Sequence, residues 1–444
     1  MPERSPQIDT DPAADATRLQ VQRRTMKVLV LMQVIGTVGV GVAPSIGVLL
    51  AGEVTNNEAW AGLARTASTL GAALLGLPLG NLAARAGRRT ALATGWWTAA
   101  SGSALLVLAA QYDLVVPLFI GLLLIGAGSA VSLQARFAAT DLAEPVRKGR
   151  SLALIVWVGT LGSVLGPNLG TPGRLLGPST GLNVYAGAFL VAAVCLALAG
   201  VLVFLFLRPD PLLHLMRTSP ELRGRGRRSG RIRLILSEIR TNRRARYALM
   251  AILTAQIVMV SIMTMTPVHI AHQGGSIEIV GLTISLHIAG MYGLSPVVGE
   301  LADRAGIRIT IGIGLAVFLA SLVIAALWPE VTGWIVLSLI LLGVGWSFVN
   351  VAGSTLFSAS VSDEVRAPAQ GGVDALSNLC GATAAFAAGP LLAVSSFPTL
   401  SVLAIAVLVP LAVLTIRPLG WTFSCTRHAT ASAVESTPCR YPAG

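Results

Sequence analysis

The stretch GELADRAGIR, residues Gly299–Arg308, returns in nearly the same form 219 positions earlier as GNLAARAGRR, residues Gly80–Arg89. Each copy is a short polar segment that lies between two long apolar stretches. Self-similarity at a fixed interval is the signature of an internally repeated architecture. The repeat therefore predicts a chain of two related halves, with the same turn at the same place in each half.

The composition indicates that the chain lies in a membrane. Of its 444 residues, 54% are hydrophobic and 12% are charged, and the mean hydropathy is +0.74. Because a soluble globular protein has about 25% charged residues, these charges are too few to cover a water-facing surface. No metal-ligand spacing relates the cysteines, so we predict neither a metal site nor a disulfide for Cys195, Cys380, Cys425 and Cys439.

The apolar stretches are long enough to span a bilayer, which takes about 20 mostly apolar residues per helix. They predict an all-α membrane protein with twelve transmembrane helices, at residues 28–51, 60–82, 90–110, 113–136, 151–172, 183–207, 247–270, 278–298, 309–328, 332–357, 372–396 and 398–416. The predicted organisation is a disordered tail, a six-helix bundle, a basic linker, a second pseudo-symmetric six-helix bundle and a second disordered tail, at residues 1–27, 28–207, 208–246, 247–417 and 418–444.

The basic residues decide the predicted orientation. With the N-terminus in the cytoplasm, all of the 32 lysines and arginines except Arg65 and Arg174 lie toward the cytoplasmic side. Cytoplasmic loops carry an excess of Lys and Arg, so we predict that both termini are cytoplasmic. The same residues account for the net charge of +12, and we therefore expect no nucleic-acid partner.

Two motifs carry a resemblance to a known family. The repeated Gly-x-Leu-Ala-Asp-Arg-x-Gly phrase resembles the loop signature of the major facilitator superfamily. The stretch GTLGSVLGPNLG, residues 159–170, is similar to the fifth-helix signature of its proton-coupled drug antiporters, with the core Gly162, Gly166, Pro167 and Gly170. The resemblance implies the twelve-helix fold of that superfamily and proton-coupled efflux.

The sequence departs from the family pattern at two places. Ala84 replaces the aspartate of the first loop copy, and Leu122 stands where the fourth helix would carry an arginine before Gly126 and Gly128. The second departure puts the usual proton-relay role of the fourth helix in doubt.

We expect the two loop copies to act as cytoplasmic gates. The predicted gating residues are Gly80, Arg85, Gly87, Arg88, Gly299, Asp303, Arg304, Gly306, Arg308, Asp141 and Arg136. The glycines permit a tight turn and close helix approach, and the arginines anchor the turn at anionic headgroups. Asp303 is predicted to latch against the start of the fifth helix, near Arg150 and Ser151, since a helix N-terminus favours an anion.

The first copy lacks that acid, so the predicted gate is asymmetric. We expect Asp141 to pair with Arg136 or Arg150, in partial replacement of what Ala84 lost.

Ionisable residues inside the spans are candidates for carrying the coupling proton. His287 lies near the middle of the eighth span, and the alternative is a neutral histidine bonded to a backbone carbonyl. Asp374, near the start of the eleventh span, is favoured there by the helix dipole alone but also remains a proton candidate. Arg65 is predicted to pair with Glu53, in either an external gate or a structural contact.

The predicted substrate cavity lies between the halves, where transporters of repeated architecture bind their substrates. Its candidate lining residues are Gln33, Trp157, Asn168, Gln256, Met263, Tyr292, Trp346, Asn350 and Asn378. These aromatic and amide groups suit a neutral or amphipathic substrate, and the sequence offers no evident inward pair of arginines for an anion. Each of them can instead serve in helix packing.

These observations predict a secondary transporter that exports small amphipathic or hydrophobic compounds by alternating access. We expect it to be a multi-pass, monomeric protein of a bacterial inner membrane, whose partners are a small-molecule substrate, protons and membrane lipids. No Gly-x-x-x-x-Gly-Lys phosphate loop or catalytic constellation is present, so we predict neither a cofactor nor an enzyme. The alternatives are an importer of a nutrient or metabolite on the same fold, and a non-transporting membrane sensor or scaffold.

Overall fold

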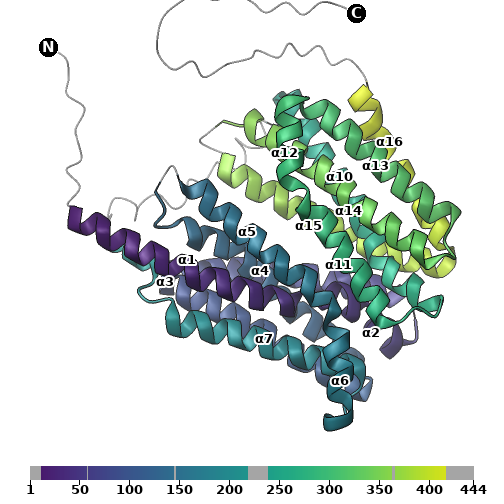
Figure 1. Ribbon diagram of the computed structural model, residues 1–444, viewed down its shortest axis with the longest axis horizontal. Coiled ribbons are helices and arrows are strands. Elements are labelled where there is room, and N and C mark those ends of the chain that lie inside the picture. Colours follow the sequence, from purple (N-terminus) through teal and green to yellow (C-terminus); the bar gives the residue numbers. More distant parts are fainter. Residues whose placement is uncertain (1–11, 58, 145–146, 219–238, 363–365, 417–444) are drawn as a thin grey trace, which may run out of the picture.

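The long apolar runs fold as helices, because in lipid each backbone N–H and C=O has to find its partner within the protein. The computed structural model describes residues 12–57, 59–144, 147–218, 239–362 and 366–416, and in these residues it contains helices and turns but no strand (Figure 1). The predicted tails, at residues 1–11 and 417–444, and the central part of the predicted linker, residues 219–238, lie outside the described residues.

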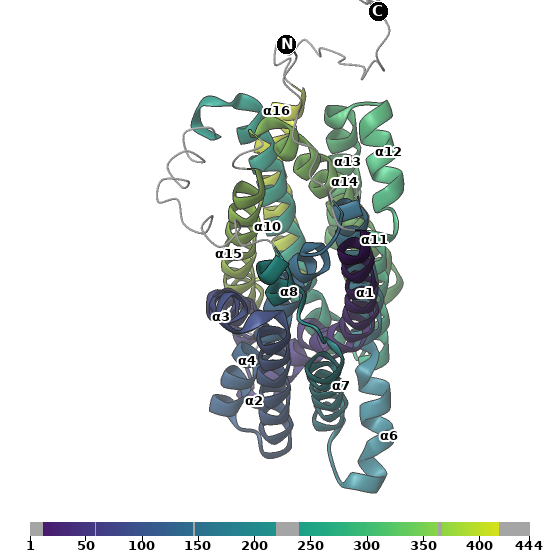
Figure 2. The same cartoon turned by 90° about the vertical axis from the view of Figure 1, so that its left-hand side faces the viewer.

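The helices form two groups, which lie beside one another in Figures 1 and 2. The N-half comprises α1 (Pro12–Val40), the π-helix η1 (Ala43–Gly47), α2 (Val48–Thr55), α3 (Ala59–Tyr112), α4 (Val115–Thr140), α5 (Lys148–Leu165), the 3₁₀-helix η3 (Gly166–Leu169), α6 (Gly170–Thr180), α7 (Val184–Phe206) and α8 (Pro211–Thr218). The C-half comprises α10 (Arg243–His272), α11 (Ile277–Gly293), α12 (Ser295–Arg304), α13 (Ile307–Leu327), α14 (Thr332–Ser360), α15 (Arg366–Val394) and α16 (Phe397–Ile416).

Asparagine side chains cap the N-termini of two of these helices. The Asn183 side chain accepts a hydrogen bond from the N–H of Ala186 at 2.8 Å, and so caps α7. At the start of α10, Asn242 accepts from the N–H of Arg244 at 2.9 Å. Such caps satisfy N–H groups that a helix leaves without partners in its first turn.

Eleven helical segments of the described residues are long enough and apolar enough to cross a membrane. One of them, α3, has 54 residues and is broken at Gly87, whose φ of 88° and ψ of 171° are not helical. The two parts fold back on each other, because a Cβ built on Gly95 would lie 2.9 Å from Cδ1 of Leu79. A straight helix would separate these residues by about 24 Å. The α3 segment is therefore a helical hairpin that turns at Gly87.

Each half has its own hydrophobic core. The buried side chains of the N-half core lie between Leu29 and Leu207, and those of the C-half core lie between Ala245 and Leu411. Val48 of α2 and Ala61 of α3 are exceptions, because they pack with the C-half core. The start of α3 is therefore a place where the two halves meet.

The repeated phrase makes an equivalent turn in the two halves. Gly87 and Gly306 have φ values of +88° and +94°, a region that side chains rarely adopt, and this agrees with the predicted tight turns. The prediction was wrong for Gly80 and Gly299. Both lie within helices and have no close neighbour, since the nearest atom to a Cβ at Gly80 would be 4.0 Å away and Gly299 has none within 4 Å.

The first helix begins at Pro12, whereas we predicted a disordered tail through residue 27. Polar contacts to the end of α4 explain the extension. Arg18 Nε donates to the carbonyl of Leu142 at 3.1 Å, and Gln22 Nε2 donates to the carbonyl of Ala139 at 2.8 Å. The polar part of α1 is therefore ordered by protein contacts beyond the apolar run.

We predict that Gly87→Ala destabilises the protein by about 1–3 kcal/mol, because the new side chain would be strained at this φ and ψ. The added Cβ would also collide with the Asp210 carboxylate. Thermal unfolding of the purified protein in detergent, followed by circular dichroism, measures the change. Gly80→Ala, in the helix seven residues before this turn, is the matched control and should leave the melting temperature unchanged or raise it. Equal melting temperatures for the two variants would contradict the assignment.

Candidate functional site

The two halves touch at one end of their helices. We call it the contact end and define it by residues 59–66, 164–174, 277–285 and 382–389. There Asn168 Nδ2 donates to Oγ of Ser285 at 2.7 Å, and this hydroxyl donates to the carbonyl of Val164 at 2.6 Å. The predicted cavity residue Asn168 is therefore part of a hydrogen-bonded contact between η3 and α11.

Two further polar contacts join the halves at the contact end. Thr66 Oγ1 of α3 donates to the carbonyl of Ala382 of α15 at 2.9 Å. Arg174 of α6 pairs with Glu278 of α11, with Nη2 2.6 Å from Oε1. Each of the recorded hydrogen bonds and ion pairs between the halves lies at this end.

The glycines and the proline of the fifth-helix motif pack against helices of both halves. Gly162 and Gly166 lie against the backbone of α1, and a Cβ at Gly166 would meet Val38 O at 2.6 Å. On the other side, the Pro167 carbonyl would lie 2.6 Å from a Cβ at Gly281, and Gly170 faces Ile277. The motif therefore lets α5 and η3 approach the N-half and the C-half closely at the same time.

The opposite end of the halves carries Gly87 and Gly306, and we call it the turn end. In the N-half, Arg88 forms a bidentate ion pair with Asp141, with Nε 2.8 Å from Oδ2 and Nη2 3.2 Å from Oδ1. This corrects the predicted pairing of Asp141 with Arg136 or Arg150. The reason is that α4 ends beside the Gly87 turn, which brings the carboxylate to Arg88.

Both partners of this pair are largely buried, with side-chain exposures of 14% for Arg88 and 11% for Asp141. Burial raises the pKa of the Asp141 carboxyl above its ordinary value, while the Arg88 hydrogen bond and charge act in the opposite direction. The pair therefore depends on Arg88 to keep a buried carboxylate ionised.

A second carboxylate holds the same turn. Asp210 Oδ2 accepts from the N–H of Arg89 at 2.7 Å, while Oδ1 accepts from the N–H groups of Leu212 and Leu213 at 3.0 and 3.1 Å. One side chain thus caps α8 and fixes the start of the second part of α3. The exposed Ala84 takes no part in these contacts.

Different polar contacts stabilise the turn end of the C-half. Arg308 Nη2 donates to the carbonyls of Leu414 and Thr415 at 3.2 and 3.1 Å, and Arg304 pairs with the exposed Glu300 at 2.6 Å. Asp303 is exposed and makes no recorded hydrogen bond or ion pair with another described residue. The predicted latch between Asp303 and the start of α5 is not formed in this conformation.

Two arginines of the N-half lie toward the C-half at different levels, Arg65 at the contact end and Arg136 nearer the turn end. Arg65 of α3 interacts electrostatically with Tyr292 and His287 of α11, and Arg136 of α4 interacts with Tyr292 and with Asp374 of α15. We call Arg65, Arg136, Tyr292 and Asp374 the inter-half cluster. The sequence analysis did not relate these arginines to the C-half, because their positions depend on how α3 and α4 pack against each other.

Neither arginine of the cluster has an ion pair or side-chain hydrogen bond with another described residue. The predicted Arg65–Glu53 pair is not formed, and the Glu53 carboxylate lies close to the Tyr185 side chain instead. A charged side chain within a membrane costs about 2.5–3.5 kcal/mol on insertion scales and marks a functional position by default.

Aromatic and amide groups adjoin the cluster on the C-half. The rings of Tyr292 and Trp346 meet edge to face with centroids 5.8 Å apart, and Trp346 Nε1 donates to Gln256 Oε1 at 3.2 Å. Three helices, α10, α11 and α14, therefore meet at these side chains. Of the other predicted lining residues on these helices, Met263 is buried in the C-half core and Asn350 is half-buried.

Two exposed residues of α15 lie on the side of the helix that meets the N-half. Asp374 and Asn378 precede Ala382 at intervals of four residues, and Ala382 accepts the hydrogen bond from Thr66. Positions four apart share a helix face. Both side chains are therefore directed toward the N-half at a level where the halves make no recorded polar contact.

The two remaining predicted lining residues lie on α1 and α5. Trp157 is 57% exposed and lies two turns from Val164, on the face of α5 that meets α11. Gln33 is buried between α1 and α5, where its Nε2 would lie 2.9 Å from a Cβ at Gly159. The predicted lining set is thus divided between inter-half positions and helix packing.

His287 has the surroundings of a core residue. Its side chain is 0% exposed, and Nδ1 lies 2.7 Å from the carbonyl of Leu339 on α14. Nε2 has no hydrogen-bond partner among the described residues. These contacts match the alternative of a histidine bonded to a backbone carbonyl, while its proposed part in proton coupling stays a prediction.

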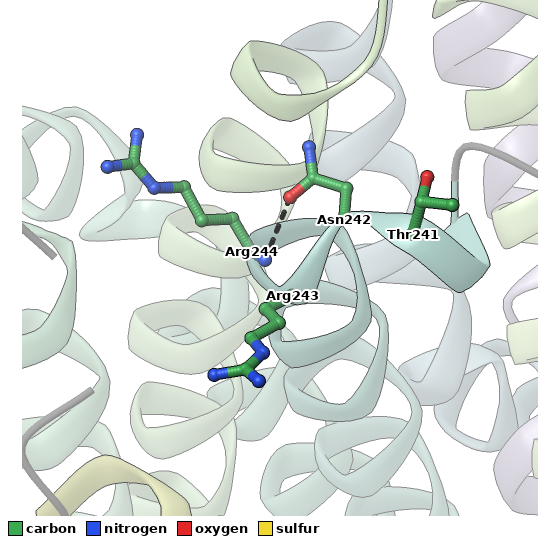
Figure 3. A pocket seen from close by; sticks show the side chains of 4 residues that line it. All are labelled: Thr241, Asn242, Arg243 and Arg244. Carbon is green, nitrogen blue, oxygen red and sulfur yellow. Dashed lines mark hydrogen bonds between the residues drawn. The ribbon is translucent and has the colours of Figure 1, made fainter. Parts of the chain in front are cut away.

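Two pockets open at the turn end, away from the inter-half cluster. Figure 3 shows one at the start of α10, where Asn242 caps the helix and the side chains of Arg243 and Arg244 extend in different directions. The other lies between the Gly87 turn and α8, and is lined in part by Arg89, Asp210 and Arg217. Both are basic surface features of the kind that contact anionic headgroups.

The chain belongs to the Major Facilitator Superfamily, whose profile matches residues 28–385 and 269–422. It is 35% identical over 383 residues to the Uncharacterized MFS-type transporter YddS of Bacillus subtilis (strain 168), which covers 85% of this chain and 87% of that protein. It is also 29% identical over 381 residues to the Riboflavin transporter RfnT of Brucella anthropi, covering 85% of this chain and 91% of the relative. The family and these relatives identify the chain as a multi-pass membrane transporter.

Solved structures share the same fold. The nucleoside transporter NupG matches with a TM-score of 0.66 and 14% identity, covering 89% of this chain and 98% of that one. A bacterial homolog of the human lysosomal transporter Spinster, in an inward-facing and unoccupied conformation, matches with a TM-score of 0.64 and 16% identity, covering 91% and 94% of the two chains.

We predict that Arg88→Gln destabilises the protein by about 3–5 kcal/mol, because it leaves the buried Asp141 carboxylate without its counter-charge. The double variant Arg88→Asp with Asp141→Arg should recover part of this loss. Thermal unfolding in detergent is the measurement.

Arg147→Gln is the matched control for this experiment. Its ion pair with Glu144 has exposures of 69% and 42%, so its loss should change stability by less than about 1 kcal/mol. A similar decrease for Arg88→Gln and Arg147→Gln would show that the Arg88 pair has no special structural role.

Proposed function

We propose that this chain is a proton-coupled exporter of small amphipathic or hydrophobic compounds, of the drug:proton antiporter branch of its superfamily. In this proposal it acts as a monomer in a bacterial inner membrane, among membrane lipids, and exchanges its substrate for protons. It crosses the bilayer twelve times, since the α3 hairpin counts as two crossings, and both termini lie in the cytoplasm.

The observation that carries the proposal is the one-sided contact between the halves. Polar contacts join the halves at the contact end. At the turn end the polar contacts lie within each half, between Arg88 and Asp141 in the N-half and between Arg308 and the end of α16 in the C-half. With cytoplasmic termini, this arrangement corresponds to a state open toward the cytoplasm. The Spinster homolog, which shares the fold, was solved in an inward-facing state, and alternating access requires such a state.

The fifth-helix motif favours export over import. Gly162 and Gly166 pack on α1, while Pro167 and Gly170 pack on α11. The motif therefore lies at the interface between the halves, whose contacts have to change when the transporter changes state. The resemblance of this motif to that of proton-coupled drug antiporters supplies the direction of transport in this proposal.

Among the proton candidates, the geometry favours Asp374 over His287. Asp374 is exposed and directed toward the N-half, within electrostatic range of Arg136. His287 is buried against α14 and bonded to a backbone carbonyl. A residue that carries the coupling proton has to be accessible to water from each side of the membrane in turn. The exposed Asp374 meets this requirement better than the buried His287.

We predict that Asp374→Asn abolishes proton-coupled transport, because an amide cannot take up and release the coupling proton. The test uses everted vesicles from an efflux-deficient bacterial host, energised to a pH gradient that acridine orange reports. Compounds are first selected by a growth-inhibition panel with the native chain. Each selected compound should dissipate the gradient with the native chain and not with Asp374→Asn.

His287→Asn is the comparison variant. It should retain compound-dependent proton movement, apart from any loss of protein level measured by immunoblot. Coupling that survives Asp374→Asn but is lost in His287→Asn would assign the proton to the histidine instead. No compound-dependent proton movement with the native chain would remove the exporter proposal itself.

A second prediction tests alternating access. In a chain whose native cysteines are replaced by serine, Gly170→Cys with Ile277→Cys should form a disulfide, because a Cβ at Gly170 would lie 3.1 Å from Ile277 Cγ1. Closing the contact end covalently should stop transport, and reduction with dithiothreitol should restore it. Thiol labelling measures the disulfide, and undiminished transport by the cross-linked protein would rule out a rocking mechanism at this interface.

The alternative of a metabolite transporter on the same fold is favoured by one observation. The relative RfnT is a riboflavin transporter, and its likeness to this chain covers 85% of the sequence. Uptake of radiolabelled riboflavin by whole cells, compared with uptake by everted vesicles, separates this function and its direction from export.

A further inference from the structure

The pocket between the Gly87 turn and α8 is small and basic, and we call it the turn pocket. It is lined in part by Arg89, Arg208 and Arg217. Its volume of about 280 Å³ lies just below the range of about 300–1,000 Å³ that drug-sized ligands occupy. The turn pocket therefore has room for a small charged group rather than for a whole drug-sized molecule.

The fold fixes the position of Arg89 in this pocket. Its backbone N–H donates to Asp210 Oδ2 at 2.7 Å, and its guanidinium carbon lies 5.1 Å from the centre of the Phe204 ring on α7. The ring face attracts the cation and holds it in place. Because the Arg89 side chain has no recorded ion pair or hydrogen bond with a described residue, its N–H groups can donate to a ligand.

The charges that line the turn pocket do not balance. Three arginines accompany a single carboxylate, Asp210, whose oxygens already accept from three backbone N–H groups. Arg208 and Arg217 are exposed, and neither has a recorded ion pair with a described residue. Guanidinium groups bind phosphate through paired hydrogen bonds, so a phosphate group suits this set of donors.

The surface of α7 next to the pocket is apolar and exposed. Val201 and Leu205, four residues apart on one helix face, have exposures of 40% and 51%, and Arg208 follows shortly after the end of this helix. Beside them Trp97 of α3 is 37% exposed, and its ring packs against Phe204 with centroids 5.4 Å apart. An apolar strip that ends at a basic pocket matches a molecule with apolar chains and an anionic headgroup.

We propose that the turn pocket binds the phosphate of an anionic phospholipid, whose acyl chains lie along the strip formed by Val201, Leu205 and Trp97. Arg89, Arg208 and Arg217 hold the phosphate. Basic pockets beside membrane helices bind anionic headgroups in this way. The site joins one lipid molecule to the Gly87 turn and to α8, and it does not depend on the direction or the substrate of transport.

The test uses phospholipids with brominated acyl chains, because bromine quenches the fluorescence of a nearby tryptophan such as Trp97. Brominated phosphatidylglycerol and phosphatidylcholine with identical chains are titrated into the purified full-length protein in detergent. We expect phosphatidylglycerol to reach half-maximal quenching at a concentration at least about tenfold lower, the ratio that one charged hydrogen bond supplies. No saturable quenching by phosphatidylglycerol, or a ratio near one, would overturn the proposal.

Arg89→Gln and Arg208→Gln should each reduce this ratio to about one, because each removes a charged hydrogen bond of that size. Since Arg208 is exposed, its variant should fold normally, and melting temperatures check both variants. Arg147→Gln, an exposed arginine of the N-half outside the pocket, is the control and should keep the full preference. A preference that survives both pocket variants would place the lipid elsewhere.

Two further arms test the position and the nature of the ligand. Trp97→Phe should lose most of the saturable quenching by phosphatidylglycerol, and quenching that persists undiminished would exclude acyl chains along this strip. Inorganic phosphate should not displace the lipid at equal concentration, because it lacks acyl chains, whose burial contributes about 0.8 kcal/mol per CH₂ group. Displacement at equal concentration would show that the turn pocket binds a soluble anion instead of a lipid.

Discussion

Close approach of helix backbones is the constraint on which this structure depends. Lipid is as apolar as leucine, so helices in a bilayer gain little from burying apolar side chains against one another and associate instead through close packing. Glycines allow this in both halves and between them. Gly71 and Gly126 bring α3 against α4, and Gly62 and Gly389 bring the start of α3 against the end of α15. The halves therefore meet through backbone surfaces rather than through interlocking side chains.

Much of the fold could be predicted from the sequence, because apolar length reports directly on which segments can span a bilayer. The duplicated phrase also placed Gly87 and Gly306 at equivalent turns. The ends of the helices could be predicted less well from the sequence. The order of α1 from Pro12 depends on hydrogen bonds of Arg18 and Gln22 to α4, and such tertiary contacts leave no periodic signal.

The candidate site was only partly predictable for the same reason. Residue type identified Tyr292, Trp346, Gln256 and Asp374, since aromatic, amide and acidic groups are rare within apolar spans. That Arg65 and Arg136 lie toward the C-half could not be inferred, because it depends on how α3 and α4 pack. Likewise the partner of Asp141 was mistaken, since sequence proximity favoured Arg136 and Arg150 over the more distant Arg88.

The sparse bonding at the contact end has a thermodynamic consequence. Three side-chain hydrogen bonds and one partly exposed ion pair hold the halves together there, and such bonds contribute about 1 kcal/mol each. Breaking these polar bonds thus costs on the order of 4 kcal/mol, to which the loss of the close packing of Gly62 and Gly389 is added. A ligand with a thousandfold difference in affinity between the two orientations supplies about 4.1 kcal/mol. Occupancy of one binding position is therefore enough to offset the loss of these polar bonds in a 46 kDa molecule.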